Sequence, residues 1–168
     1  MTQKVLGIAG YKNAGKTTLT ASLVAELTGR GHKVSTIKHA HHHFDLDHPG
    51  RDSHRHREAG AHEVAIVSRN RWALIHELRT EDEPPMDEML AKLAPCDLVI
   101  IEGYRHGAIP KIEAVNEEMD HPRLAGADEN VVAVATNGDV AAEPVPAFNR
   151  DDIGAIADFV SELTGLGS

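Results

Sequence analysis

The sequence of 168 residues has a single cysteine, few aromatic residues and no long apolar run. Because Cys96 has no partner for an internal disulfide, a reducing, cytoplasmic location is expected. No stretch approaches the roughly 18 apolar residues of a membrane span, and the first residues lack the apolar core and cleavage site of a signal peptide. Hydrophobic residues still make up 41% of the chain, which is enough for a globular core.

Positive charge is also scarce, with 17 Lys and Arg against 26 Asp and Glu and a net charge of −9 when histidines are neutral. Nucleic-acid binding requires Lys and Arg to neutralise phosphates, so we expect no nucleic-acid partner. The twelve histidines titrate near neutral pH, however. A local positive pocket for an anionic ligand is therefore compatible with the negative total.

The apolar pattern begins with a strand, a helix and a second strand. Residues 5–10 form a short apolar run, Leu19, Leu23 and Leu27 recur on one helix face, and residues 32–39 are strand-like. Further strands are expected at 63–70, 71–78, 96–103, 110–116 and 130–138, helices at 55–61, 84–93 and 150–163, and a loop at 118–129. This order predicts one α/β domain over residues 1–168, with a largely parallel sheet flanked by helices.

The most specific local motif is GYKNAGKT, residues 10–17, which matches the P-loop (Walker A) pattern G-x-x-x-x-G-K-[ST] between a strand and a helix. Its glycines permit a backbone whose N–H groups point at phosphate oxygens, and the helix N-terminus adds its positive dipole end. Lys16 is expected on the β- and γ-phosphates and Thr17 on Mg²⁺. The expected nucleotide-binding residues of the loop are Gly10, Asn13, Ala14, Gly15, Lys16, Thr17 and Thr18. The motif predicts a P-loop NTPase fold.

Two acidic residues follow apolar strands in the manner of nucleotide-site partners. Glu102 ends the strand DLVIIEG at the edge where parallel sheets bind ligands, so it is the expected acidic partner of Mg²⁺. Asp139 follows the strand at 130–138, where many GTPases read guanine through a motif such as [NT]KxD. Asn137 replaces the usual lysine of that motif, so an ordinary Asn-Gly-Asp turn is an equal alternative.

Seven of the twelve histidines lie between Ile37 and Ala61. Three interpretations stay open: a solvated polar loop, a metal site in which His41 and His43 share a strand face, or an anion clamp formed by Lys38, His39 and an arginine. Because this stretch follows the second strand, we expect it near the nucleotide. Asp52, which follows a turn at Gly50, is the expected further contact to Mg²⁺.

The P-loop, the KHAHHHFDLDHPGRDSHRHREAGA stretch, the RWAL run and DLVIIEGYR occur in an order that resembles the MobB family of molybdopterin-guanine dinucleotide biosynthesis adaptor proteins. The resemblance extends to about residue 163. It implies a homodimeric GTP-binding adaptor with weak GTPase activity, with GTP and Mg²⁺ as cofactors. It also implies action with the guanylyltransferase MobA, and molybdopterin or its guanine dinucleotide as a possible ligand. By position, the resemblance assigns phosphate binding to Gly10, Gly15, Lys16 and Thr17 and the acidic role to Glu102.

Two other P-loop classes are alternatives. Nickel metallochaperone GTPases also combine a P-loop with many histidines, but they are expected to carry a Cys-based ligand set such as Cys-Pro-His, and Cys96 is followed by Asp97. A small-molecule kinase would need an acceptor site and a base, and the sequence singles out neither.

Overall fold

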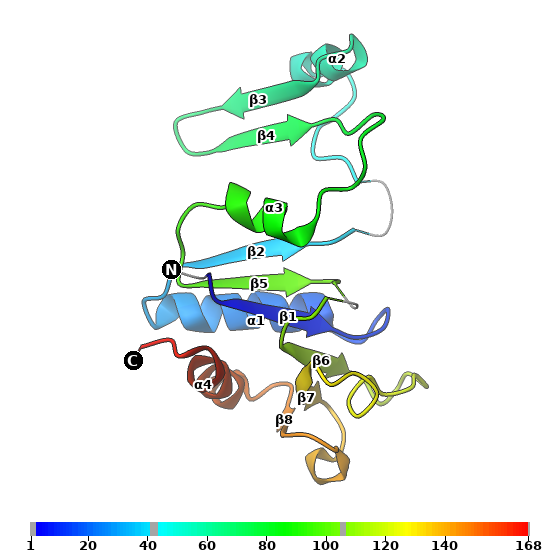
Figure 1. Cartoon of the computed structure of the whole chain (residues 1–168), viewed down its shortest axis with the longest axis vertical. Coiled ribbons are helices and arrows are strands. Elements are labelled where there is room, and N and C mark those ends of the chain that lie inside the picture. Colours follow the sequence, from blue (N-terminus) through cyan, green and yellow to red (C-terminus); the bar gives the residue numbers. More distant parts are fainter. Residues whose placement is uncertain (1–2, 41–43, 105–106, 168) are drawn as a thin grey trace. The chain divides into compact units, whose positions relative to one another are not determined.

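The computed structural model describes residues 3–40, 44–104 and 107–167 (Figure 1). The chain forms two compact units, one from Met1–His39 with Met89–Ser168 and the other from Ala40–Glu88. The single nucleotide-binding domain over residues 1–168 stays a prediction. Within the described residues, no helix is both long and apolar enough to cross a membrane.

Six parallel strands form the sheet of the larger unit (Figure 1). They are β1 (Val5–Ala9), β2 (Val34–Lys38), β5 (Leu98–Glu102), β6 (Lys111–Val115), β7 (Val131–Thr136) and β8 (Ala147–Asn149), in the spatial order β2-β5-β1-β6-β7-β8. All neighbouring pairs are parallel, which confirms the predicted fold class. The edge strand β8 is not among the expected strands, because three residues are too few to show a period.

Two helices of the larger unit, α1 (Lys16–Gly29) and α4 (Ile153–Thr164), pack against each other and against the sheet. The predicted apolar face of α1 is confirmed, since Leu19, Leu23 and Leu27 are all buried. Each such leucine stabilises the fold by about 2 kcal/mol. Leu163, in the last turn of α4, is 40% exposed. Helix α3 (Met86–Lys92) precedes β5 in the chain.

A loop rather than a helix joins β6 to β7, as predicted for residues 118–129. Its Leu124 and Ala125 form a second apolar cluster with Val134 of β7. The fully buried neighbours Ala133 and Ala135 belong to the cluster of the helices, so β7 packs on both faces. The loop therefore fills the place that a helix takes in many α/β units.

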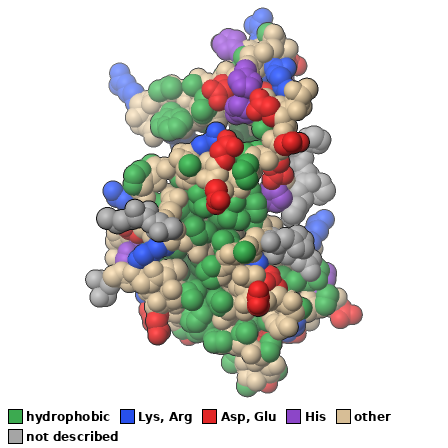
Figure 2. Space-filling model, in the orientation of Figure 1, with side chains coloured by type: hydrophobic (Ala, Val, Ile, Leu, Met, Phe, Trp, Pro, Cys, Tyr) green, Lys and Arg blue, Asp and Glu red, His purple; other side chains and the backbone are tan. Residues whose placement is uncertain are grey.

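The smaller unit contains α2 (Asp52–Glu58) and an antiparallel hairpin of β3 (Glu63–Val67) and β4 (Trp72–His76). The hairpin confirms the two predicted strands, and Ser68 N–H donates to the Arg71 carbonyl at 2.9 Å in its turn. Its strands carry large apolar side chains at the surface (Figure 2): Ile66, Val67, Trp72 and Leu74. A two-stranded hairpin with so much exposed apolar surface is marginal by itself.

Candidate nucleotide-binding site

The loop between β1 and α1 has the backbone that a phosphate cradle requires. Gly10 (φ 137°), Asn13 (φ 65°) and Gly15 (φ 97°) all have positive φ. A Cβ on Gly10 would stand 2.5 Å from the carbonyl oxygen of Ala114, so only glycine fits between β1 and β6. Gly15 is the N-cap of α1 and supplies no side-chain cap, which leaves the first amides of the helix available to an anion. The predicted turn chemistry is present at both glycines.

Lys16 folds back over this cradle. Its Nζ donates to the carbonyl oxygen of Tyr11 at 2.7 Å. Burial lowers the pKa of Lys16 below its usual value; nearby Glu102 opposes this effect and Lys38 adds to it. The Lys16 ammonium therefore binds a carbonyl of the loop itself, at the place where a phosphate would lie. Among the other predicted nucleotide-binding residues of this segment, Ala14 is buried, whereas Asn13, Thr17 and Thr18 are exposed to solvent.

Glu102 lies against the start of α1. The Thr17 hydroxyl donates to Glu102 Oε1 at 2.9 Å, and Lys38 Nζ lies 3.4 Å from the same oxygen. The register explains this meeting, because Glu102 at the end of β5 pairs with Lys38 of β2 and with Ile8 of β1. A hydroxyl and a carboxylate in contact are the oxygen donors that Mg²⁺ prefers. The magnesium role of both residues stays a prediction.

The residues after β5 bring β2 close to this site. Gly103 has φ 103°, and a Cβ there would stand 2.8 Å from the His39 carbonyl oxygen. His39 N–H donates to the Glu102 carbonyl at 2.8 Å, and its ring lies 4.7 Å from that of Tyr104. His39 is thus the histidine of the His-rich stretch that the larger unit holds beside Glu102. His41, His42 and His43 lie outside the described residues.

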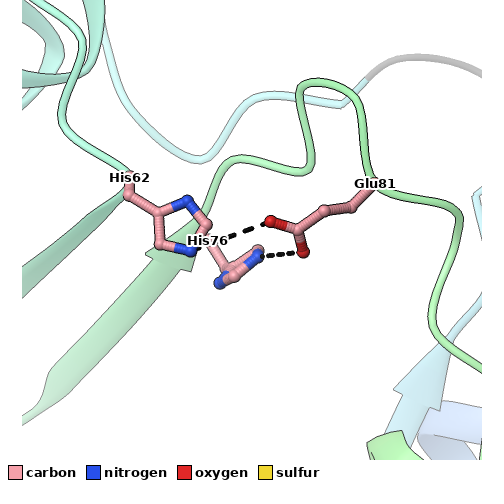
Figure 3. A group of neighbouring side chains, drawn as sticks. All are labelled: His62, His76 and Glu81. Carbon is pink, nitrogen blue, oxygen red and sulfur yellow. Dashed lines mark hydrogen bonds and ion pairs between the residues drawn. The ribbon is translucent and has the colours of Figure 1, made fainter.

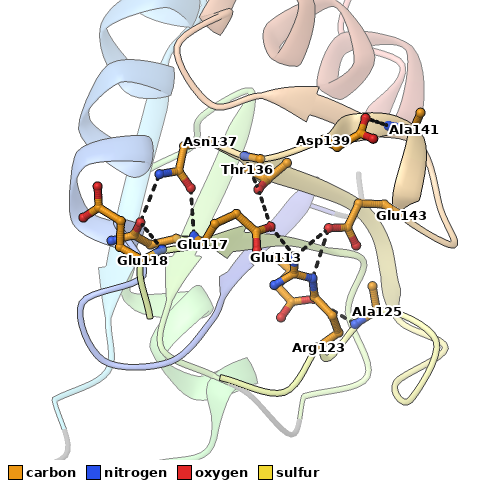
Figure 4. A network of polar contacts seen from close by, with 12 residues as sticks. Glu113, Glu117, Glu118, Arg123, Ala125, Thr136, Asn137, Asp139, Ala141 and Glu143 are labelled. Carbon is orange, nitrogen blue, oxygen red and sulfur yellow. Dashed lines mark hydrogen bonds and ion pairs between the residues drawn. The ribbon is translucent and has the colours of Figure 1, made fainter. Parts of the chain in front are cut away.

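The predicted guanine contact is engaged in a local turn. Asp139 Oδ1 accepts from Ala141 N–H at 2.9 Å and caps the short 3₁₀ helix η1 (Val140–Ala142). Asn137 instead joins the ends of β6 and β7 (Figure 4): its Oδ1 accepts from Glu117 N–H at 2.9 Å, and its Nδ2 donates to Asn116 Oδ1 at 3.1 Å. Asp139 remains exposed, and its contact with guanine stays a prediction.

Asp52 belongs to the smaller unit, where it is the exposed first residue of α2. Two neighbouring carboxylates hold the segment before this helix. Asp47 is buried and accepts from the Ser53 hydroxyl at 3.0 Å, and Asp45 accepts from Arg57 at 2.8 Å. A backbone hydrogen bond from Asp47 N–H and this arginine lower the pKa of Asp45. The predicted role of Asp52 at the metal stays a prediction.

Three residues beside the cradle were not singled out from the sequence. The Nη1 of Arg150, just after β8, is 3.9 Å from the place of a Cβ on Gly15, which brings a guanidinium to the phosphate loop. On the other side, the rings of Tyr11 and His121 stack at 4.8 Å, and His121 Nε2 lies 3.3 Å from the Lys12 carbonyl oxygen. Tyr11 occupies a variable position of the P-loop pattern, so its residue type carries no signal. Arg150 and His121 stand in no motif, because each reaches the loop only through the packing of a distant segment.

Comparison with known proteins gives the family of the chain. A family model for MobB, described as molybdopterin guanine dinucleotide synthesis protein B, matches residues 5–137. The molybdopterin-guanine dinucleotide biosynthesis adapter protein of Escherichia coli strain K12 is 35% identical over 161 residues, which cover 94% of this chain and 91% of that protein. The protein of the same name from Haemophilus influenzae is 40% identical over 160 residues, covering 93% and 86%.

Solved structures show the same fold. A crystal structure of molybdopterin-guanine biosynthesis protein B (mobB) has a TM-score of 0.74 and 26% identity, covering 96% of this chain and 99% of that one. A MobB homologue from Bacillus stearothermophilus has a TM-score of 0.70 and 26% identity, covering 97% and 99%. Because the family model matches most of the chain and the two adapter proteins are at least 35% identical over 93% or more of it, the chain belongs to the MobB family.

Proposed function

We propose that this chain is a GTP-binding adaptor that assists the guanylyltransferase MobA in the biosynthesis or delivery of molybdopterin-guanine dinucleotide. The observation that carries the nucleotide part is the contact of Thr17 with Glu102 beneath a cradle that only glycine permits at Gly10. The adaptor part is supported by the names of the relatives from E. coli and H. influenzae. Family membership favours this function over a nickel metallochaperone GTPase or a small-molecule kinase.

The residues of the cradle fit a nucleoside triphosphate with Mg²⁺. The amides around Gly15 would bind phosphate oxygens, and Lys16 would exchange its bond to the Tyr11 carbonyl for the β- and γ-phosphates. Thr17 and Glu102 would hold the metal ion, which supplies charge neutralisation between the phosphates. Arg150 would add a positive charge beside the same loop.

Hydrolysis by this site should be slow. The carboxylate next to the cradle, Glu102, is already engaged by Thr17 and Lys38, so it is a poor base for the attacking water. Slow turnover suits an adaptor, whose nucleotide state has to persist while a partner is bound. We place this activity in the cytoplasm, in keeping with the single unpaired thiol of Cys96.

A homodimer is part of the proposal. The exposed apolar side chains of the hairpin support it, since Val67 is 76% and Trp72 is 71% exposed in the single chain. Apolar surface of this kind on a hairpin marks an interaction site. Molybdopterin, or its guanine dinucleotide, is the further ligand that the adaptor role implies.

Calorimetric titration of GTP with Mg²⁺ tests the nucleotide site. Lys16→Ala should weaken binding at least about 100-fold, equivalent to about 2.7 kcal/mol, because the phosphate charge loses its half-buried cationic partner. Lys33→Ala is the matched control, because Lys33 precedes β2 at the opposite end of the strand and should leave affinity unchanged. Unaltered GTP affinity in Lys16→Ala would refute the phosphate assignment, and binding of ATP equal to GTP would refute guanine specificity.

Capture of purified MobA, with and without GTP, tests the adaptor role separately. We expect binding in at least one nucleotide state. Failure to bind in both states, with a nucleotide site that works, would remove the adaptor part of the proposal while leaving GTP binding in place.

A further inference from the structure

The open end of the β3–β4 hairpin gathers two histidines and a glutamate in the smaller unit (Figure 3). His62 immediately precedes β3, His76 is the last residue of β4, and Glu81 follows in the next turn. Glu77 N–H donates to the His62 carbonyl at 3.0 Å, which extends the ladder one residue beyond the strands. The hairpin register therefore places both imidazoles at one end of the hairpin.

A strained turn returns Glu81 to this end. Arg79 has φ 50°, a left-handed conformation that costs a non-glycine residue about 1 kcal/mol or more. Its guanidinium donates to the Ala61 carbonyl at 3.1 Å, next to His62, and Glu81 N–H donates to the Leu78 carbonyl at 2.6 Å. The backbone from Leu78 to Glu81 is thus fixed to the residues that carry the first histidine.

The ligand atoms meet at metal-binding distances. His76 Nε2 lies 3.0 Å from Glu81 Oε2, His62 Nε2 lies 3.8 Å from Glu81 Oε1, and all three groups offer an atom within 4.8 Å of the others. Two ligands of a tetrahedral zinc ion, each about 2 Å from the metal, are about 3.3 Å apart. We propose that His62, His76 and Glu81 form a binding site for a divalent transition-metal ion, with Zn²⁺ as the best match.

Glu63 supplies the outer partner that such sites use. Its Oε1 lies 2.9 Å from His76 Nδ1, the ring nitrogen that points away from Glu81. A carboxylate on Nδ1 fixes the tautomer that presents Nε2 to a metal and increases the basicity of the ring. Glu63 is also the residue that pairs directly with His76 across the hairpin, so the strand register itself supplies this contact.

The donor set selects the class of ion. Two imidazole nitrogens disfavour Mg²⁺ and Ca²⁺, which take oxygen ligands, and favour zinc and its neighbours in the transition series. Three protein ligands leave at least one coordination position for water or for a group from a bound molecule. All three side chains are exposed, so this position is open to solvent.

This site differs from the histidine hypotheses raised by the sequence. Those hypotheses concern the stretch from Ile37 to Ala61, whereas His62 directly follows that stretch and His76 is 14 residues further along the chain. A bound ion would tie the turn at Glu81 to the base of the hairpin. The site is also independent of the proposed Mg²⁺ site, which takes Thr17 and Glu102 of the larger unit.

Calorimetric titration of Zn²⁺ into the chelator-treated full chain tests the site, with Co²⁺ absorption as a report on the ligands. Because imidazole is a general ligand of zinc and the chain has twelve histidines, the quantity to follow is the tightest equivalent. Glu81→Gln and His76→Ala should each abolish it or weaken it at least about 100-fold, and Glu63→Gln should weaken it about 10- to 100-fold. The visible Co²⁺ spectrum should change in the same variants.

Asp82→Asn and His32→Ala are the matched controls. Asp82 is the exposed neighbour of Glu81, and His32 is a histidine of the larger unit; both variants should retain the tightest equivalent. Glu81→Gln alters an exposed side chain without changing its size, so loss of fold should not confuse the result, and circular dichroism verifies this. An unchanged tightest equivalent in Glu81→Gln and His76→Ala would overturn the proposal and leave a hydrogen-bonded surface cluster only.

Discussion

At the scale of single residues, a buried lysine forms an ion pair with a carboxylate of the following loop. Lys111 is 1% exposed at the start of β6, and its Nζ lies 2.8 Å from Asp128 Oδ2. The Lys111 hydrogen bond, with further hydrogen bonds from Asn130, lowers the pKa of Asp128 to about 2. Because a buried ammonium without a partner is very unfavourable, this pair fixes the loop at residue 128 to the strand.

Acid should weaken this contact in a defined pH range. Asp128 has a folded-state pKa below that of the unfolded chain, so its stabilising effect is present above about pH 4 and is lost as the pH falls toward about 2. The effect is on the order of 1–2 kcal/mol, allowing for partial exposure of the carboxylate. Urea unfolding followed by circular dichroism between pH 2 and 6 measures it.

The variant Asp128→Asn gives a second measurement on the same pair. It should cost about 3 kcal/mol at pH 7, because Lys111 loses its counter-charge, and it should flatten the pH dependence below pH 4. Adding Lys111→Met should recover part of the loss by removing the orphaned charge. An unchanged acid slope in Asp128→Asn would assign the pH dependence to other carboxylates.

Gly10 is the other single residue on which the site depends. Gly10→Ala would bring a methyl group to 2.5 Å from the Ala114 carbonyl at φ 137°. We expect a loss of about 2–4 kcal/mol in unfolding free energy together with loss of GTP binding. Gly29→Ala is the control, because its Cβ would meet nothing within 4 Å and Gly29 has no positive φ, so this change should be neutral or stabilising. Equal stability of the two variants would show that the close approach of β1 and β6 is not limiting.

At the scale of elements, the loop from β6 to β7 is anchored by a buried carboxylate. Glu113 is 2% exposed, and its two oxygens accept from Leu124 N–H at 2.9 Å and Ala125 N–H at 2.8 Å (Figure 4). The strand thus satisfies the amides that a helix would have satisfied internally. This explains how a connection of irregular backbone can cover the sheet.

Glu113→Ala should therefore release the loop. Two buried amides would lose their acceptors, at a cost of about 2–4 kcal/mol in unfolding free energy. Amide exchange at Leu124 and Ala125 should accelerate more than exchange in α1, and NMR can follow both. Glu118→Ala changes an exposed carboxylate of the same loop and should have little effect. Exchange that rises equally everywhere would indicate global destabilisation instead of local release.

At the scale of the whole molecule, the β3–β4 hairpin exposes large apolar side chains to solvent in the single chain. Val67 and Trp72 form the last pair before its turn, and both are more than 70% exposed. Paired Val67→Ser and Trp72→Ser changes should shift the proposed dimer toward monomer by at least about tenfold in dissociation constant, because dimer formation would bury this apolar area.

Sedimentation equilibrium measures this shift directly. Val140→Ser, at an exposed apolar residue of η1 in the larger unit, is the control and should leave the dimer unchanged. A wild-type chain that stays monomeric at high concentration would remove the homodimer from the proposed function, without affecting the nucleotide or zinc sites.

The order of strands and helices was largely predictable because the signals are local. The apolar residues of β1 and β5, the leucine spacing of α1 and the residues of the P-loop all act within a few residues of one another. The helix expected at 55–61 lies three residues earlier, at Asp52–Glu58, since Gly60 takes a left-handed conformation that ends it. Strand β8 is too short to show a pattern.

The sequence by itself determined the conformation of the loop between β1 and α1, because glycine, lysine and threonine at fixed spacing between a strand and a helix are typical of that backbone. It also indicated Glu102, because the end of a fully apolar strand is a predictable place in a parallel sheet. Only the tertiary structure decided which distant side chains meet there or elsewhere. Arg150 reaches Gly15 through β8, and Glu81 reaches His62 and His76 through hairpin register and a turn at Arg79. Such contacts depend on how separated segments pair in the fold, and residue spacing along the chain does not show which segments will pair.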